Sequence, residues 1–350
     1  MKRVLVCALD WGLGHATRCI PVVNELQRQG AEVFLASSGE AGKLLQLEFP
    51  QLVYHGLPGY RPRYANDGVM VITLAMQLRK FVHAIRLEHE EVEALAKNLR
   101  LDAVISDNRY GCFTTTAPSI LITHQAQVRM PPGWGFLGTW VNHRLRTYIK
   151  RYDKLWVPDQ PDSGLTNPFM DRHLPYSYVG WLSRFPSGQP AGEPVDLMIV
   201  LSGPEPQRSK LEEVILKQLQ TYPGKALLVR GKPMEGQEYR EGNIQIVSHL
   251  STDQMEARIK SAGLLISRSG YSTVMDFIAL EKRAVFIPTP QQPEQLWLAT
   301  FLKRNGIAFC MDQQNFVLAT ALAQSSNYSG LGALKPVKGL LEKEISTLLS

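Results

Sequence analysis

Short apolar runs alternate with longer amphipathic stretches along most of the chain. The apolar runs have the length of buried strands, and the stretches between them repeat apolar residues at helical spacing. Strands that alternate with helices in this way are typical of a parallel sheet covered by helices. The predicted strands are 3–9, 32–37, 103–105, 119–123, 196–201, 226–230, 244–247, 264–266 and 284–287, and the predicted helices are 15–30, 75–100, 209–221, 252–261 and 337–349.

A proline-rich stretch divides this pattern into two. Residues 156–194 contain seven prolines and interrupt the alternation of strands and helices. The sequence therefore predicts a Rossmann-like domain over 1–160, a linker over 161–194, a second Rossmann-like domain over 195–335 and a C-terminal helix over 336–350. A chain of 350 residues gives each domain enough length for a core of its own.

The composition is that of a globular protein, with 44% hydrophobic and 20% charged residues. The net charge of +6 suggests attraction to anionic ligands or lipids, and no nucleic-acid-binding signature accompanies it. Four scattered cysteines without metal-ligand spacing predict reduced thiols and a cytoplasmic location. The apolar run at residues 4–9 is too short for a signal peptide, and no run approaches the roughly eighteen apolar residues of a membrane span. Any membrane contact is therefore expected to be peripheral, on the inner face of the cell membrane.

The segment 263–302 reads as strand, polar turn, helix, strand and polar loop. The turn lies at a predicted helix start, where partial positive charge and backbone N–H groups favour a phosphate. Asp276, about one and a half turns into that helix, can accept hydrogen bonds from two ribose hydroxyls. Glu294 and Gln295 in the following loop offer groups suited to sugar hydroxyls. The segment thus predicts a nucleotide-sugar site made of Ser267, Arg268, Ser269, Gly270, Thr273, Asp276, Glu294 and Gln295.

This segment resembles the C-terminal signature of glycosyltransferase family 28, the group that contains the N-acetylglucosaminyltransferase of peptidoglycan synthesis. The match is carried by Ser267, Arg268, Gly270 and Thr273, and Asp276 stands where the family has Glu. The resemblance implies an α/β protein of GT-B architecture, in which two Rossmann-like domains face each other across a cleft. It also implies that the C-terminal helix packs against the first domain, and that a nucleotide-sugar donor is used without a cofactor.

A glycine loop follows the first predicted strand, with the sequence Asp10-Trp11-Gly12-Leu13-Gly14-His15, and Arg18 comes three residues later. Gly12 and Gly14 let a substrate approach the backbone, and the pKa of an imidazole suits proton transfer near neutrality. The loop resembles the G-x-G-H-x-x-R element of family 28 enzymes and of related nucleotide-sugar hydrolases. We predict His15 as the general base, with Asp10 as the alternative base or as the residue that orients His15. The competing interpretation is that His15 caps the helix or binds substrate without titrating.

Polar side chains also follow two other predicted strands of the first domain. Because the carboxyl ends of parallel strands meet at one edge of a sheet, these side chains are expected near the glycine loop. Carboxylate, imidazole and amide groups can bind acceptor hydroxyls. The alternative is a structural role, in which these side chains cap the strand ends. The predicted acceptor-binding residues are Gly12, Gly14, Arg18, Asp107, Asn108, His124 and Gln125, of which Asp107 and His124 are also alternative catalytic groups.

The turn at residues 202–208 aligns with a glycine-rich turn of family 28 and keeps Gly203 and Arg208. Arg208 can neutralise a diphosphate. The alternative interpretation, to which we give equal weight, is that Arg208 is a solvated arginine at a helix start. The chain has no Asp-x-Asp motif of the kind that commonly holds a divalent metal. We therefore expect no metal, with the diphosphate stabilised by the helix start at Ser269-Gly270 and by Arg208 or Arg268.

Basic and aromatic residues are interleaved over residues 129–154, which hold six Lys or Arg against one Asp. Such a basic aromatic face is attracted to an anionic bilayer surface. An ordinary helix with core aromatics and solvated cations is the alternative. The aromatic and apolar members are Trp134, Phe136, Leu137, Trp140, Tyr148 and Tyr152.

Taken with the resemblance, these motifs predict an inverting glycosyltransferase that moves a sugar from a nucleoside diphosphate to an acceptor hydroxyl. The resemblance favours UDP, with the base beside Met255, and an acceptor on a lipid carrier or glycolipid. Two alternatives stay open. One is a nucleotide-sugar hydrolase of the same fold, and the other is a noncatalytic sugar-nucleotide-binding protein.

Overall fold

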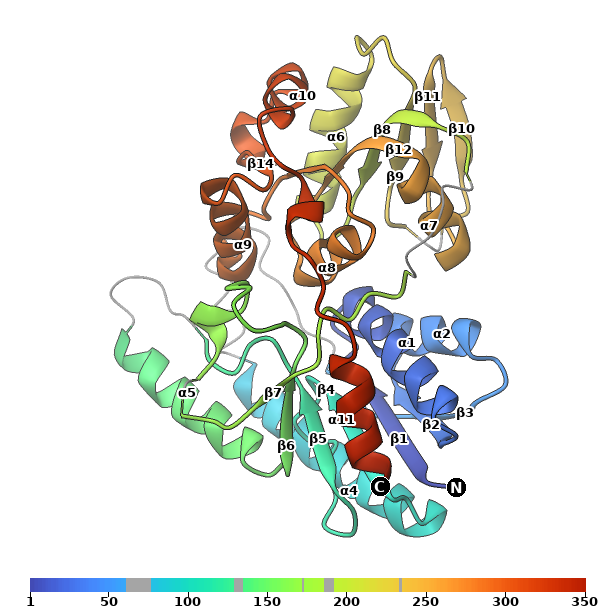
Figure 1. Ribbon diagram of the computed structural model, residues 1–350, viewed down its shortest axis with the longest axis vertical. Helices are drawn as coiled ribbons and strands as arrows, with labels where there is room; N and C mark the ends of the chain where they lie inside the picture. Colours follow the sequence, from blue (N-terminus) through green and yellow to red (C-terminus); the bar gives the residue numbers. More distant parts are fainter. Residues whose placement is uncertain (61–76, 129–134, 172, 186–191, 233–234) are drawn as a thin grey trace. The chain divides into compact units, whose positions relative to one another are not determined.

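The computed structural model describes residues 1–60, 77–128, 135–171, 173–185, 192–232 and 235–350. These residues form two compact units, and each unit contains a seven-stranded sheet with helices on both faces (Figure 1). The first unit contains the described residues up to Ser183 together with Pro336–Ser350. The second runs from Arg184 to Lys335. The predicted α/β character is therefore confirmed.

The sheet of the first unit is parallel throughout its described pairings, in the order β3-β2-β1-β4-β5-β6-β7. Its strands are β1 Arg3–Ala8, β2 Glu32–Ser37, β3 Val53–Gly56, β4 Ala103–Asp107, β5 Ser119–Ile122, β6 Lys154–Val157 and β7 Ser177–Tyr178. The helices of this unit are α1 Leu13–Arg28, α2 Gly39–Glu48, α4 Leu78–Leu99, α5 Gly135–Ile149 and α11 Leu340–Leu349.

β1 is apolar at every buried position because both of its faces are covered. Val4 and Val6 belong to a core shared with α1 and α2, whereas Leu5 and Cys7 belong to a core shared with α4. Successive side chains of a strand point to opposite faces, so a strand covered on both sides cannot show polar alternation. This is the physical reason for the uninterrupted apolar runs of the sequence.

The C-terminal helix α11 packs on the first unit, beside α1 (Figure 1). Ile345 is fully buried in the core that lies between the sheet and α1. The Gln29 amide donates to the backbone carbonyl of Glu342 at 2.9 Å, and the indole N–H of Trp156 donates to Glu344 at 3.1 Å. The last helix therefore closes a core whose other members come from the start of the chain.

The second unit has the strand order β10-β11-β9-β8-β12-β13-β14, in which β10 is antiparallel to β11 and the other described pairings are parallel. α6 and α10 share a core with one face of the sheet. On the other face, Phe277 of α8 stacks on Phe286 of β13 with 6.0 Å between ring centroids. The strands are β8 Val195–Val200, β9 Ala226–Val229, β10 Glu238–Glu241, β11 Ile244–Val247, β12 Ala262–Ser267, β13 Ala284–Phe286 and β14 Phe309–Cys310. The helices are α6 Gln207–Leu219, α7 Thr252–Ser261, α8 Tyr271–Ala279, α9 Pro293–Arg304 and α10 Leu318–Ser325.

The proline-rich stretch is more structured than an extended linker. Residues 161–183 fold with the first unit, and β7 adds to the edge of its sheet by pairing with β6. The buried Asp159 carboxylate accepts hydrogen bonds from Thr166 and from the indole of Trp181, among others. One side chain thus organises a loop that proline content alone described as a connection.

Candidate active site

In the first unit, the candidate site lies where β1 gives way to α1. Gly12 caps the start of α1 with a φ of +94°, a conformation that L side chains rarely adopt. This glycine turns the chain so that His15 falls in the first turn of the helix. β4 pairs with β1 in parallel, and the register places Asp107 opposite Ala8, directly before the glycine loop. Strand pairing therefore brings Asp107 beside the helix start.

His15 and Asp107 form a close hydrogen-bonded pair. His15 Nδ1 lies 2.6 Å from Asp107 Oδ1, and the Asp107 side chain is fully buried beneath it. Arg18 donates to both oxygens of the same carboxylate, from Nε and from Nη2, the latter at 2.7 Å. A carboxylate that accepts from an imidazole on one side and a guanidinium on the other is held in a single orientation.

The surroundings set the charge of this pair. Burial acts to raise the pKa of Asp107, but Arg18 and His15 together bring it below its ordinary value, so the carboxylate is ionised at neutral pH. Burial lowers the pKa of His15, and the positive charge of Arg18 adds to that effect against the opposing pull of Asp107. A neutral His15 whose Nδ1–H is donated to Asp107 keeps a lone pair on Nε2. That nitrogen can take a proton from a hydroxyl.

His124 lies close to the same group, after the end of β5. Its Nδ1 is 2.9 Å from Arg18 Nη1, and its side chain is largely buried. The neighbouring backbone is fixed by the hydrogen bond from the N–H of Gln125 to the Thr123 hydroxyl at 3.0 Å. The sequence prediction that the ends of β1, β4 and β5 converge is therefore correct for His15, Asp107 and His124.

Three predicted residues of this unit have surroundings that the sequence did not indicate. Asp10 accepts from the backbone N–H of Tyr60 at 3.2 Å and lies 3.7 Å from Arg109, so the carboxylate that holds His15 is Asp107. Arg18 was predicted to bind the acceptor, but only 1% of it is exposed and it holds protein groups. Asn108 is half-buried with a φ of +54°.

A second buried charged group lies next to Asp10 and was missed in the sequence. Arg109 is fully buried, with Nη1 at 3.0 Å from Glu88 Oε1 of α4 and Nη2 donating to the Ser38 hydroxyl at 2.5 Å. The Tyr60 hydroxyl donates to Glu88 Oε2 at 2.5 Å. Burial raises the pKa of Glu88 to about 7, although the neighbouring Arg109 opposes the shift. A charged residue at apolar spacing in the predicted helix 75–100 was the signal that could have revealed it.

In the second unit, the predicted donor residues gather at the carboxyl ends of β8, β12 and β13. Gly203 has a φ of +105°, and a Cβ there would lie 3.6 Å from the Thr289 hydroxyl. The Ser269 hydroxyl donates to the backbone carbonyl of Gln295 at 2.8 Å, and the Gln295 side chain accepts from the Thr289 N–H at 2.8 Å. The three strand-end loops are thereby tied into one surface, with Gly270 as the residue before α8.

The start of α8 is the element of this surface that the sequence predicted to bind an anion. Gly270 adopts an extended conformation and accepts the first intrahelical bond, from Val274 at 3.0 Å. Thr273 lies in the first turn, and a Cβ on Gly270 would be 3.9 Å from its hydroxyl. The first turn contains no acidic residue that would compete with a phosphate for the positive end of the helix dipole.

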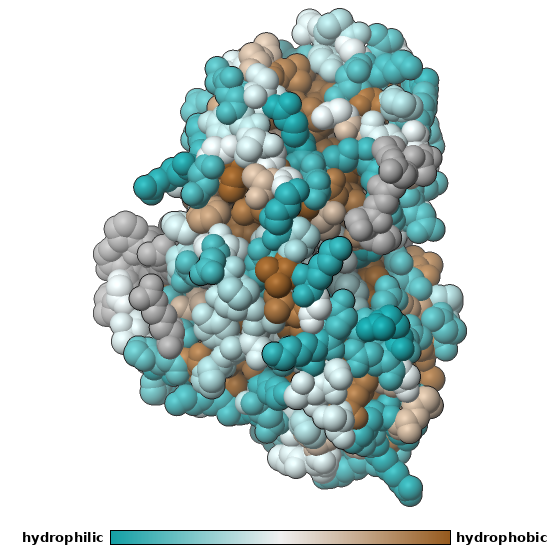
Figure 2. All heavy atoms as spheres, viewed as in Figure 1, coloured by the Kyte–Doolittle hydropathy of each residue, from teal (hydrophilic) through white to brown (hydrophobic). Residues whose placement is uncertain are grey.

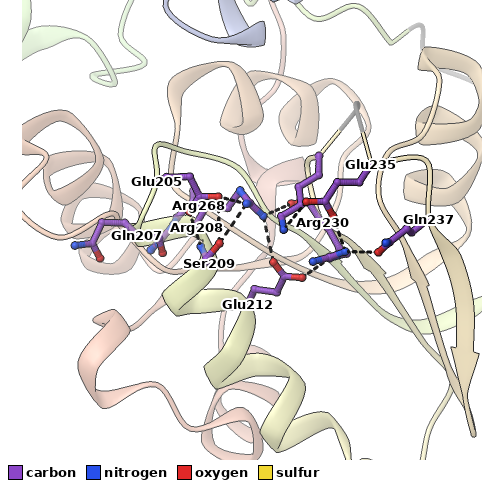
Figure 3. Close-up of polar contacts among 10 residues, drawn as sticks. Glu205, Gln207, Arg208, Ser209, Glu212, Arg230, Glu235, Gln237 and Arg268 are labelled. Carbon is purple, nitrogen blue, oxygen red and sulfur yellow. Dashed lines mark hydrogen bonds and ion pairs between the residues drawn. The ribbon is translucent and has the colours of Figure 1, made fainter. Parts of the chain in front are cut away.

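The two predicted phosphate-binding arginines are both engaged by the protein. Arg268 is fully buried and donates to the carbonyls of Ile287, Pro288 and Gln207 and to the Gln313 side chain. Arg208 donates to Glu205, Glu212 and the carbonyl of Arg230, and Arg230 in turn joins Glu212 and Glu235 (Figure 3). A diphosphate at this turn would compete with the exposed carboxylate of Glu205 for the Arg208 guanidinium.

Arg184 is a cation near the donor residues that the sequence did not single out. Its Nε lies 3.9 Å from Asp276 Oδ2, and its guanidinium covers the Phe185 ring at 4.6 Å. Nη1 reaches the Thr252 hydroxyl at the start of α7, at 3.4 Å. Of the remaining predicted donor residues, Met255 is buried on α7 and Glu294 is half-buried in the first turn of α9.

The basic aromatic face divides into an exposed part and a structural part. Trp140 is 45% exposed on α5, with Arg144 over its ring at 5.6 Å. Arg146 forms an ion pair with the buried Asp171, and Tyr152 is buried with its hydroxyl donating to the Arg109 carbonyl. Arg129 and Trp134 lie outside the described residues. On the visible face of the molecule, hydrophilic side chains predominate (Figure 2).

Two features are absent from the part of the chain that the structure describes. No helix in this part is both long and apolar enough to cross a bilayer. No group of three or more His, Cys, Asp or Glu side chains in the described ranges is placed to hold a metal ion.

Comparison with known proteins now gives the class. Residues 208–327 match the model of the glycosyltransferase family 28 C-terminal domain. An uncharacterized glycosyltransferase of Methanopyrus kandleri is 25% identical over 326 residues, covering 87% of this chain and 92% of the relative. The crystal structure of Acinetobacter baumannii MurG covers 100% of this chain and 99% of its own at a TM-score of 0.60 and 16% identity. The spinosyn rhamnosyltransferase SpnG in complex with thymidine diphosphate covers 100% and 96% at a TM-score of 0.62 and 14% identity.

The fold is therefore that of the GT-B glycosyltransferases, and the family match and the curated relative support glycosyltransferase activity. Within that class, the resemblance of the C-terminal segment to family 28 is confirmed, because the matched residues span α6 to α10 and contain the donor surface of the second unit.

Proposed function

We propose that the protein is an inverting glycosyltransferase that uses a UDP-sugar donor and an acceptor hydroxyl carried on a lipid. The second unit binds the nucleoside diphosphate, and His15 of the first unit is the general base. The observation that carries the proposal is the His15–Asp107 pair at 2.6 Å, because it leaves a neutral imidazole with Nε2 able to accept a proton. A noncatalytic binding protein would have no need of such a pair.

In the proposed reaction, the acceptor oxygen forms a bond to the anomeric carbon of the donor sugar from the face opposite the diphosphate. The bond between that carbon and the diphosphate oxygen breaks, and its electron pair leaves with the diphosphate. His15 Nε2 receives the proton of the acceptor hydroxyl, and Asp107 stabilises the imidazolium that results. A single displacement of this kind inverts the configuration at the anomeric carbon.

The departing diphosphate gains negative charge, which the start of α8 is suited to stabilise. Backbone N–H groups and the helix dipole act without reorganisation when charge develops. We propose that this replaces a divalent metal, so that transfer continues in the presence of EDTA. Support for a nucleoside diphosphate comes from the relative SpnG, which was crystallised with thymidine diphosphate. Thermal stabilisation by UDP compared with dTDP tests which nucleobase the donor site prefers. The ligand with the higher occupancy stabilises the folded protein more.

The function is tested by measuring transfer and UDP affinity in His15→Ala. Loss of a general base should reduce kcat by about 100-fold to 10,000-fold while the dissociation constant for UDP stays close to that of the wild type. His83→Ala is the matched control, because His83 is exposed on α4 and should leave both quantities unchanged. Full transfer activity in His15→Ala would remove His15 as the base. Release of free sugar at a rate independent of acceptor would instead identify a nucleotide-sugar hydrolase.

A further inference from the structure

Arg18 is almost fully buried. It contacts His15 on its own helix, Asp107 on β4 and His124 in the loop after β5. It lies one turn after His15 on α1, and its Nε and Nη2 donate to the two oxygens of Asp107 on β4. Its third nitrogen, Nη1, lies 2.9 Å from Nδ1 of His124, which follows β5. A single guanidinium therefore joins the carboxylate beneath His15 to a second imidazole.

The chemistry of these groups fixes which ring nitrogen of each histidine carries the proton. A guanidinium only donates hydrogen bonds, so Nδ1 of His124 must accept from Arg18, and the proton of a neutral His124 ring is on Nε2. Nδ1 of His15 lies 2.6 Å from Asp107 Oδ1 and 2.9 Å from Arg18 Nη2. An ionised carboxylate only accepts, and a lone pair on Nδ1 would face this closer negative charge, so Nδ1 carries its proton toward Asp107 and Nε2 of His15 has the lone pair. The two rings are thus held in opposite tautomers.

The same contacts determine the charge that His15 tolerates. The titratable and charged groups facing His15 are Arg18 on α1, Asp107 on β4 and His124 after β5. Arg18 and Asp107 neutralise each other, and both Arg18 Nη2 and His15 Nδ1 point at Asp107 Oδ1, 2.9 Å from one another. A proton added to His15 would therefore place a second positive charge beside the guanidinium of Arg18. This repulsion lowers the pKa of His15, whereas the negative charge of Asp107 raises it.

We propose that Arg18 is a positioning residue that fixes His15 and His124 in opposite tautomers, so that His15 offers an accepting nitrogen to the hydroxylated acceptor. The assignment of the acceptor as the molecule addressed rests on the proposed function. The tautomers themselves follow from the contacts of Arg18 and Asp107 alone. The two parts can therefore fail separately.

The tautomers are measured directly on the whole wild-type protein by the ¹⁵N chemical shifts of the imidazole nitrogens, assigned with His15→Gln and His124→Gln. We expect a protonated Nδ1 in His15 and a protonated Nε2 in His124 at pH 8. The opposite tautomer in either ring overturns the proposal, whatever the activity of the protein. The expected tautomers in a protein without transferase activity would support the positioning role and refute the proposed function.

A second test uses the pH dependence of kcat/KM, which reports groups of the free enzyme. In Arg18→Gln the acid limb should move to higher pH, because the positive charge of Arg18 lowers the pKa of His15 and its removal lets that pKa rise, so kcat/KM at pH 6 relative to pH 9 should be smaller than in the wild type. In Asp107→Asn the limb should move the opposite way, to lower pH. Arg28→Gln, an exposed arginine at the end of the same helix, is the control and should keep the wild-type profile.

Opposite shifts of the acid limb are a result that a purely structural role would not produce. An equal loss of kcat/KM at every pH in both variants overturns the proposal. If either variant fails to fold, the tautomers of the wild-type protein still decide it.

Discussion

Asp276 is the residue proposed to bind the ribose hydroxyls of the donor. It is 8% exposed on α8, and its nearest described cation is Arg184, whose Nε lies 3.9 Å away. Carboxylate oxygens can accept hydrogen bonds from the vicinal hydroxyls of a ribose. Glutamate stands at this position in family 28, and aspartate supplies the same carboxylate on a side chain shorter by one methylene.

Asp276→Ala is expected to weaken UDP binding by about 1 to 3 kcal/mol, because the ribose loses charge-assisted hydrogen bonds. Isothermal titration calorimetry with UDP measures the change, and thermal unfolding of the free protein checks that the domain remains folded. Asp312→Ala, an exposed aspartate of the same unit, serves as the control and should bind UDP normally. Unchanged UDP affinity in Asp276→Ala would remove the ribose assignment.

At the scale of elements, α4 contributes a buried carboxylate to the first unit. Glu88 is fully buried between the Tyr60 hydroxyl and the Arg109 guanidinium, and burial raises its pKa to about 7. In the unfolded chain the same carboxyl titrates near its ordinary value of 4.5. Because the folded protein holds this proton more tightly, the stability that Glu88 contributes is complete below pH 4.5 and is lost as the pH rises through 7.

The free energy of unfolding should therefore fall between pH 5 and pH 8 by up to about 3 kcal/mol on account of this one group. Glu88→Gln should remove that part of the pH dependence, even though the absolute stability also changes when the pair with Arg109 is lost. Urea unfolding across the pH range measures the slope. Glu90→Gln, an exposed glutamate on the same helix, should retain the wild-type slope. Parallel pH profiles for wild type and Glu88→Gln would contradict the prediction.

At the scale of the whole molecule, the open question is where the acceptor is met. A lipid-linked acceptor requires contact with a membrane surface, and α5 offers an exposed Trp140 beside Arg144. Unlike Arg144, Arg146 forms an ion pair with the buried Asp171, so its charge is not directed toward a membrane surface. The part of α5 that could meet a membrane is therefore narrower than its composition suggested.

The protein is expected to bind liposomes that contain anionic lipid at low ionic strength and to release them as salt is added. Each cation near an anionic surface contributes up to about 1 kcal/mol, and salt screens that attraction. Trp140→Ala combined with Arg144→Ala should weaken sedimentation with the liposomes, while Arg28→Gln, which is remote in sequence and exposed on α1, should not. Absence of binding by the wild-type protein at low salt would favour a soluble acceptor.

The sequence by itself predicted nine of the fourteen strands in the described residues and the two glycine turns that hold the candidate site residues, but it missed β3, β6, β7, β10 and β14. Apolar runs placed most strands to within a residue or two, because burial on both faces of a parallel sheet leaves an uninterrupted apolar signal. The two glycine turns were also readable, since a turn from strand to helix at an anion or substrate site demands small residues at fixed positions. The apolar runs and the glycine turns depend on residues that are close together in the chain, so the sequence alone reveals them.

Only the tertiary structure decided which charges meet. Asp107 stands 92 residues from His15, and it reaches that side chain because β4 lies next to β1 in register. Arg268 looked like a phosphate ligand in the sequence, yet the carbonyls that surround it come from the ends of β13 and the start of α6. Strand order and burial decide whether a polar residue faces a ligand or another part of the protein, and neither is encoded in the spacing of residues along one strand. His15 was therefore proposed as the base from the sequence, and its hydrogen-bond partners came from the fold.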